Sequence, residues 1–160
     1  MILILVMPIL TNMKINNLYV QHKEIVKQVE ENMETVHVSN ALSEIWNIIS
    51  RSNKYIDETA PWVLAKSENT EDREKLASVM YHLVENLRIV AILLKPFMTD
   101  TSKKMLEQLG INNENITNWE SVHTYGNLEV GTKVIEKGEP LFIRLDMEEE
   151  VNYIREGMKK

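Results

Sequence analysis

Apolar residues recur every three or four positions along three long segments of this 160-residue chain, and a proline lies between the second and the third. This spacing places apolar side chains on one face of an α-helix. The stripes run from Tyr19 to Val36, from Ala41 to Ile56, and from Leu76 to Leu94. Amphipathic helices bury such stripes against one another, so the sequence predicts an all-α antiparallel helical bundle.

Local signals set the expected ends of the helices. Ser39 is the expected N-cap of the second helix, and Asn69 or Thr70 that of the third, because short polar side chains accept hydrogen bonds from the first turn. A fourth, shorter helix is predicted over 101–109, where Gly110 suits a C-terminal cap.

The helical period is lost after residue 110, and the segment 111–140 predicts an irregular arm with one short strand pair. A short polar helix is predicted over 147–157. We therefore expect three regions: an atypical segment 1–18, a helical bundle 19–110, and a C-terminal arm with its terminal helix, 111–160, that belongs to the same domain.

The first ten residues, MILILVMPIL, are apolar but interrupted by Pro8. They have about half the length that a membrane span requires and lack the basic region of a signal peptide. We expect no membrane partner, and we expect this segment to cover an exposed apolar groove.

Composition excludes several kinds of site. The chain has no cysteine, which rules out disulfides and thiolate metal sites and fits a cytoplasmic location. Its formal charge of −6 opposes binding to phosphates except through a local basic patch.

The titratable side chains show no catalytic or metal-binding pattern. The four histidines, at 22, 37, 82 and 123, lack metal-ligand spacing, and no carboxylate pair or glycine-rich phosphate loop is present. His82 and Glu85, three residues apart, predict a hydrogen-bonded pair on the surface. We expect no catalytic residue and no metal ligand.

The proline step at Ala60–Pro61 predicts a sharp elbow. A helix stops before such a step because proline disfavours the α conformation of the preceding residue, yet proline suits the first position of a new helix. Trp62 therefore lies in the first turn of a second helical piece, beside the polar end of the first.

Polar residues share one face of the helix that precedes this elbow. Asn53 and Asp57 are one turn apart, and Ser50 and Trp46 continue the face upstream. An aromatic ring beside amide and carboxylate groups is suited to an unstacked nucleotide base, which stacks on the ring. The alternative is a tryptophan that packs inside the hinge, since tryptophan is highly buried on average.

The stretch NKYIDETAPWVLAK resembles the anticodon-binding domain of methionyl-tRNA synthetase, a class I aminoacyl-tRNA synthetase. Three further stretches agree in order and spacing: ALSEIWNIISRSNKYID, LKPFMTDTSKKMLEQLG and GEPLFIRLD. The resemblance covers roughly Tyr19 to Lys159.

The resemblance implies a set of RNA-binding residues at the elbow. Trp62, directly after Pro61, matches the family's anticodon-stacking tryptophan, and Asn53 and Asp57 match polar positions that line the anticodon site. Nearby cations are expected to meet backbone phosphates, with a plain solvated role as the alternative: Arg51, Lys54 and Lys66.

The chain departs from the family pattern at several positions. The family's base-reading asparagine and arginine, spaced N-x-x-x-R on an earlier helix, have no counterpart upstream of Tyr19. Ile143 and Thr99 stand where proline is common. No HIGH-like or KMSKS-like signature and no Rossmann-type pattern is present, so we expect no enzymatic activity from the chain alone.

The implied partners follow from this resemblance. They are methionine tRNA, held by its CAU anticodon stem-loop, and the catalytic domain of the synthetase, which would bind ATP and methionine, so that no cofactor is expected in this chain. The alternative function is a helical protein-interaction bundle without an RNA role, which would self-associate through exposed apolar surface.

Overall fold

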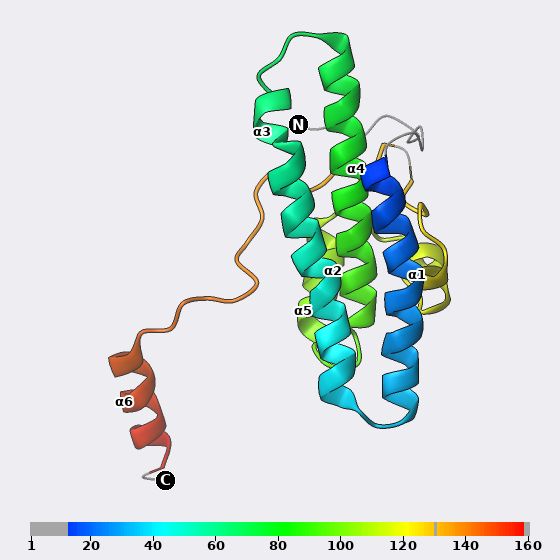
Figure 1. Ribbon diagram of the computed structural model, residues 1–160. Coiled ribbons are helices and arrows are strands. Elements are labelled where there is room, and N and C mark those ends of the chain that lie inside the picture. Colours follow the sequence, from blue (N-terminus) through cyan, green and yellow to red (C-terminus); the bar gives the residue numbers. More distant parts are fainter. Residues whose placement is uncertain (1–12, 130, 159–160) are drawn as a thin grey trace.

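The structure is a bundle of helices with an extended C-terminal arm (Figure 1). The computed structural model describes the backbone of residues 13–129 and 131–158, and side chains from residue 22 onward. In chain order the elements are α1 (Met13–Glu34), α2 (Val38–Thr59), α3 (Pro61–Leu64), α4 (Thr70–Leu93), α5 (Thr99–Gln108), the 3-10 turns η1 (Glu114–Ile116) and η2 (Glu120–His123), and α6 (Met147–Gly157).

The three long helices α1, α2 and α4 lie side by side and alternate in direction (Figure 1). The described residues form helices and turns but no strand, which confirms the predicted all-α antiparallel bundle with an irregular arm and a short terminal helix. The strand pair predicted within 111–140 is wrong, because this segment forms η1 and η2 and then an irregular chain. The division into 1–18, 19–110 and 111–160 stays a prediction, and most of the first segment lies outside the described residues.

Helix α4 is the centre of the bundle. From Tyr81 to Leu94 every residue is buried except Leu87, which is 39% exposed. α1 contributes the buried Val26 and Val29 to the core, and α2 contributes a stripe of apolar residues. By length and composition α4 could cross a membrane, but here the neighbouring elements bury most of its apolar residues.

Two charged side chains lie at the middle of this core helix. Glu85 and Arg88 are fully buried, and they form a bidentate ion pair with Arg88 Nε 2.9 Å from Glu85 Oε2 and Nη2 2.8 Å from Oε1. Buried charges require such a partner, since taking an isolated ion out of water costs several kcal/mol. The sequence prediction that Glu85 pairs with His82 on the surface is therefore wrong.

The same pair holds the segment 111–128 against α4. Arg88 Nη1 donates hydrogen bonds to the carbonyl oxygen of Ile116 at 2.7 Å and to Ser121 Oγ at 3.0 Å. Glu85 Oε1 accepts one from the backbone N–H of Gly126 at 2.8 Å. The loop satisfies the remaining hydrogen-bonding capacity of the buried pair, and the pair in turn fixes the loop.

Two histidines are buried where α1 and α4 meet this loop. His22 lies edge-on to the ring of Tyr125 at 5.4 Å, and His82 stacks on the same ring at 5.8 Å. Burial lowers the pKa of each histidine from 6.5 to about 4. Both rings are therefore neutral at physiological pH.

The helix ends differ from the prediction in two places. Val36 does not belong to the first buried stripe: it is 78% exposed and adopts a positive φ of 62° in the turn after α1. α2 begins at Val38, so His37 and not Ser39 is its N-cap residue. The Asn69 cap of α4 is confirmed, since its side chain accepts a hydrogen bond from Glu71 N–H at 3.0 Å.

A glycine lets the arm pass close to the end of α5. Gly110 has a φ of +70°, as predicted for a C-terminal cap, and a Cβ atom there would overlap the carbonyl oxygen of Lys133. The arm is fastened nearby, where Ile135 N–H donates to the carbonyl oxygen of Gln108 at 3.0 Å. Beyond this contact the chain leaves the bundle, and α6 stands apart from it (Figure 1).

Replacing Arg88 with alanine leaves the Glu85 carboxylate buried without its counter-ion. We expect this change to lower the free energy of unfolding by about 3–5 kcal/mol, measured by urea denaturation. Replacing both Glu85 and Arg88 with methionine should recover much of this stability. The control is Lys27→Ala, which removes an exposed ion pair and should leave the urea midpoint unchanged; equal midpoints for both alanine variants would contradict the role of the pair.

The buried histidines predict a loss of stability on mild acidification. The unfolded chain binds protons near pH 6.5 and the folded chain only near pH 4, so stability is complete above pH 6.5 and decreases as the pH falls towards 4. The full shift corresponds to roughly 3 kcal/mol for each histidine. Urea titrations between pH 7 and pH 5 should show this decrease in the free energy of unfolding. The decrease should be smaller in His22→Leu, and in the exposed control His37→Gln it should equal that of the unsubstituted chain.

Candidate nucleic-acid interface

The elbow forms as the sequence predicts. Ala60 ends α2 in the left-handed region, with φ 43° and ψ 59°, and its N–H donates to the carbonyl oxygen of Ile56 at 2.9 Å. Pro61 is the first residue of α3, where its missing N–H and fixed φ cost nothing. A left-handed alanine is unfavourable by about 1–2 kcal/mol, so the surrounding packing must hold this geometry.

The packing that holds the elbow comes from Leu64. Its side chain packs with Ile56 and Met80 against a small core cluster of Tyr55, Val79 and Leu83. Leu64 thus faces inward, while Trp62 is 54% exposed. The alternative of a tryptophan packed inside the hinge does not describe this ring.

The polar row upstream of the elbow is exposed along its length. Ser50, Asn53 and Asp57 are all solvent-exposed, and Trp46 at the far end is 50% exposed. Inward bonds fix the rotation of α2 that presents this row: the buried Ser52 Oγ donates to the Ile48 carbonyl oxygen at 2.8 Å and accepts from Asn86 Nδ2 of α4 at 3.0 Å.

The three cations proposed from the sequence lie around the elbow. Arg51 Nη1 is 3.5 Å from Glu58 Oε2, and both side chains are partly exposed, so this pair adds little stability. Lys54 is exposed on α2, and Lys66 is exposed just after α3. Arg51 and Lys54 therefore lie on α2 next to the polar row, and Lys66 lies on the other side of the elbow.

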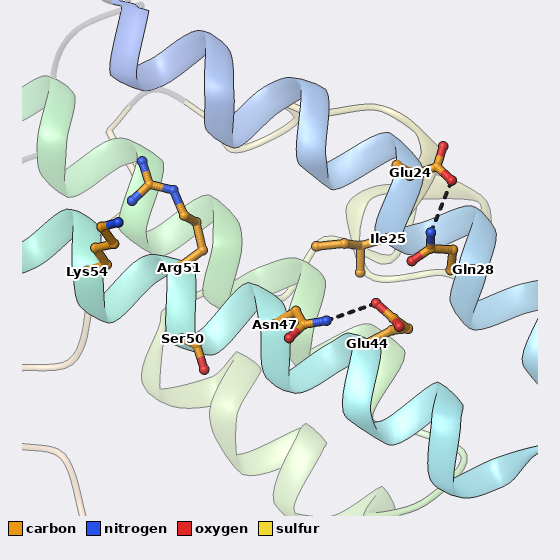
Figure 2. Close-up of a pocket in the computed structure, with 8 residues that line it drawn as sticks. All are labelled: Glu24, Ile25, Gln28, Glu44, Asn47, Ser50, Arg51 and Lys54. Carbon is orange, nitrogen blue, oxygen red and sulfur yellow. Dashed lines mark hydrogen bonds between the residues drawn. The ribbon is translucent and has the colours of Figure 1, made fainter.

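A groove of about 460 Å³ lies between α1 and α2 (Figure 2). One end contains Arg51 and Lys54, whose charged groups lie near one another, and Ser50 also lines the groove. The side chain of Ile25 lies between this end and the other. Ser50, Arg51 and Lys54 therefore belong both to the groove and to the set of polar and charged residues upstream of the elbow.

The other end of the groove carries two amide–carboxylate pairs, one from each helix (Figure 2). Gln28 Nε2 donates to Glu24 Oε1 on α1 at 3.1 Å, and Asn47 Nδ2 donates to Glu44 Oε2 on α2 at 3.0 Å. The groove is therefore dipolar, with cations at one end and carboxylates at the other.

The sequence prediction missed these four residues. Each pair is separated by three or four positions, which the sequence shows, but such pairs are common on solvated helix faces. Only the packing of α1 on α2 places them across one groove. Across the described residues no cluster of histidine, aspartate and glutamate has a metal-binding arrangement.

Comparison with known proteins agrees with this architecture. A family described as the anticodon binding domain of methionyl tRNA ligase matches residues 11–157. Methionine–tRNA ligase of Listeria monocytogenes is 53% identical over 135 residues, and methionine–tRNA ligase 1 of Bacillus cereus is 57% identical over 137 residues. These matches cover 84% and 86% of the chain but 20% of each ligase, so the chain spans about a fifth of the length of the curated relatives that it matches.

A solved structure shows the same fold. The apo form of methionyl-tRNA synthetase from Mycobacterium tuberculosis superimposes with a TM-score of 0.76 at 26% identity, over 87% of this chain and 28% of that one. Fold, sequence identity and the extent of the family match agree: the chain belongs to the family of anticodon-binding domains of methionyl-tRNA ligase.

Proposed function

We propose that this chain binds the CAU anticodon stem-loop of methionine tRNA, with the indole of Trp62 stacking on an unpaired base. The observation that carries the proposal is a half-exposed tryptophan in the first turn after the elbow, beside an exposed polar row. The backbone that carries this ring is already helical, so less conformational freedom is lost when a base stacks on it. Asn53 and Asp57 supply hydrogen-bonding groups for the edge of that base.

The cations around the elbow supply the contacts to the RNA backbone in this proposal. The chain carries a formal charge of −6, so its average field repels RNA and binding needs local positive groups. We assign this role to Arg51, Lys54 and Lys66. Because Arg51 already lies near Glu58, Lys54 and Lys66 should contribute more.

We further propose that the chain acts together with the catalytic domain of a methionine–tRNA ligase, in the cytoplasm. The relatives are ligases of about five times the matched length, and the matched region is the anticodon-binding domain. In this arrangement ATP and methionine bind the catalytic domain, and the chain described here needs no cofactor of its own.

The second candidate function is a protein-interaction bundle that self-associates. Exposed apolar side chains on the C-terminal arm and α6 favour it: Phe142, Ile143, Leu145, Met147 and Ile154. Light scattering and an RNA-binding assay together distinguish the two candidates: a stable dimer that does not bind the hairpin RNA supports the interaction bundle, whereas a monomer that binds it supports the RNA role.

Trp62→Ala should weaken binding of a hairpin RNA with CAU in its loop by roughly 5- to 150-fold, because one base–aromatic stack contributes about 1–3 kcal/mol. Fluorescence anisotropy measures the affinity. Tyr153→Ala is the matched control, since this aromatic ring is also exposed but lies on α6, which stands apart from the bundle and from the elbow. If both variants bind as the unsubstituted chain does, Trp62 is not the stacking residue.

Lys54→Ala and Lys66→Ala should each weaken binding of the hairpin RNA, whatever the sequence of its loop. Each change should also make the binding constant depend less on salt concentration. Removal of one phosphate interaction should lower the slope of log K against log salt by about 0.7, the value for single strands. Lys103→Ala, an exposed lysine on α5, serves as the control. If both variants have the same salt slope as the unsubstituted chain, neither lysine contacts an RNA phosphate.

A further inference from the structure

We propose that the groove between α1 and α2 is a second nucleotide subsite, which binds a nucleotide of the same RNA loop whose base carries an exocyclic amino group. This inference rests on the proposed function and adds to it a defined pocket and a base preference. It assigns a role to the four residues Glu24, Gln28, Glu44 and Asn47.

The polarity of the groove selects the class of ligand. Arg51 and Lys54 at one end suit an anionic group such as a phosphate. At the other end Glu24 and Glu44 are carboxylates, which only accept hydrogen bonds when ionised. The matching ligand is therefore anionic at one end and a hydrogen-bond donor at the other, as in a nucleotide of cytosine or adenine.

The two amides add acceptors and donors to the carboxylate end. Gln28 and Asn47 each use one N–H to bond their own carboxylate, at 3.1 Å and 3.0 Å. A primary amide has a second N–H and a carbonyl oxygen, which together match the amino group and ring nitrogen of cytosine or adenine. Uracil has a carbonyl in place of the amino group, so its oxygen would face the carboxylate and amide oxygens of the groove without a hydrogen between them.

The groove is continuous with the elbow site. Ser50 lines the groove and also belongs to the exposed row with Asn53 and Asp57. Lys54 lies five residues before Thr59 at the end of α2, roughly 8 Å along the helix axis, and Trp62 follows in the first turn of α3. Nucleotides of one loop can therefore occupy both sites, with Lys54 and Arg51 on the backbone between them.

Single-base replacements in the hairpin test the inference. The unsubstituted 160-residue chain should bind the CAU hairpin better, by about fivefold or more, than a hairpin in which either the cytosine or the adenine is changed to uracil. Glu44→Gln and Asn47→Ala should lose this preference while keeping the salt slope. Glu34→Gln, an exposed glutamate on α1 outside the groove, should keep both, and a urea midpoint confirms that each variant is folded.

The outcomes separate this inference from the proposed function. If the groove variants keep the full preference for the amino-bearing base, the subsite is overturned, while a loss of affinity in Trp62→Ala would leave the stacking site standing. If the unsubstituted chain binds all hairpins equally, the subsite is also overturned. If it does not bind the hairpin at all, both the subsite and the proposed function are overturned.

Discussion

The buried ion pair of Glu85 and Arg88 is the constraint on which this fold depends. Each of these two charges on the core helix has the other as its counter-ion, but the pair also needs further hydrogen-bond partners, which the other described α-helices do not supply. The segment 111–128 supplies them through backbone carbonyls, backbone N–H groups and the hydroxyl of Ser121. The irregular loop is thus as much part of the core as the helices are.

The loop also connects α4 to α1. Trp119 Nε1 donates to Glu30 Oε1 at 2.8 Å, and His123 Nε2 lies 3.1 Å from the same oxygen. Tyr125 packs between His22 of α1 and His82 of α4. Because α1 is held in this way and also packs along α2, the groove between α1 and α2 has a fixed shape, which a subsite for a small rigid ligand requires.

At the elbow, inward packing on one side leaves the polar row and Trp62 exposed on the other. Leu64 and Ile56 pack inward, and the bond between Asn86 and Ser52 sets the rotation of α2. These inward contacts offset the cost of a left-handed Ala60 and leave Trp62 and the row of Ser50, Asn53 and Asp57 towards solvent. Residues on rigid helices are positioned more precisely than residues on loops, so the arrangement suits recognition by stacking.

The sequence by itself determined the local elements. Apolar periodicity predicted the helices, Gly110 and Asn69 marked two of their ends, and Ala60–Pro61 marked the elbow, because each of these signals acts within a few residues along the chain. It did not show that Glu85 pairs with Arg88, that His82 is buried, or that 111–128 forms turns instead of a strand pair. Those features depend on which distant segment covers α4, and only the tertiary structure decided them. The same holds for the groove, whose carboxylates and amides come from two helices that meet only in the folded chain.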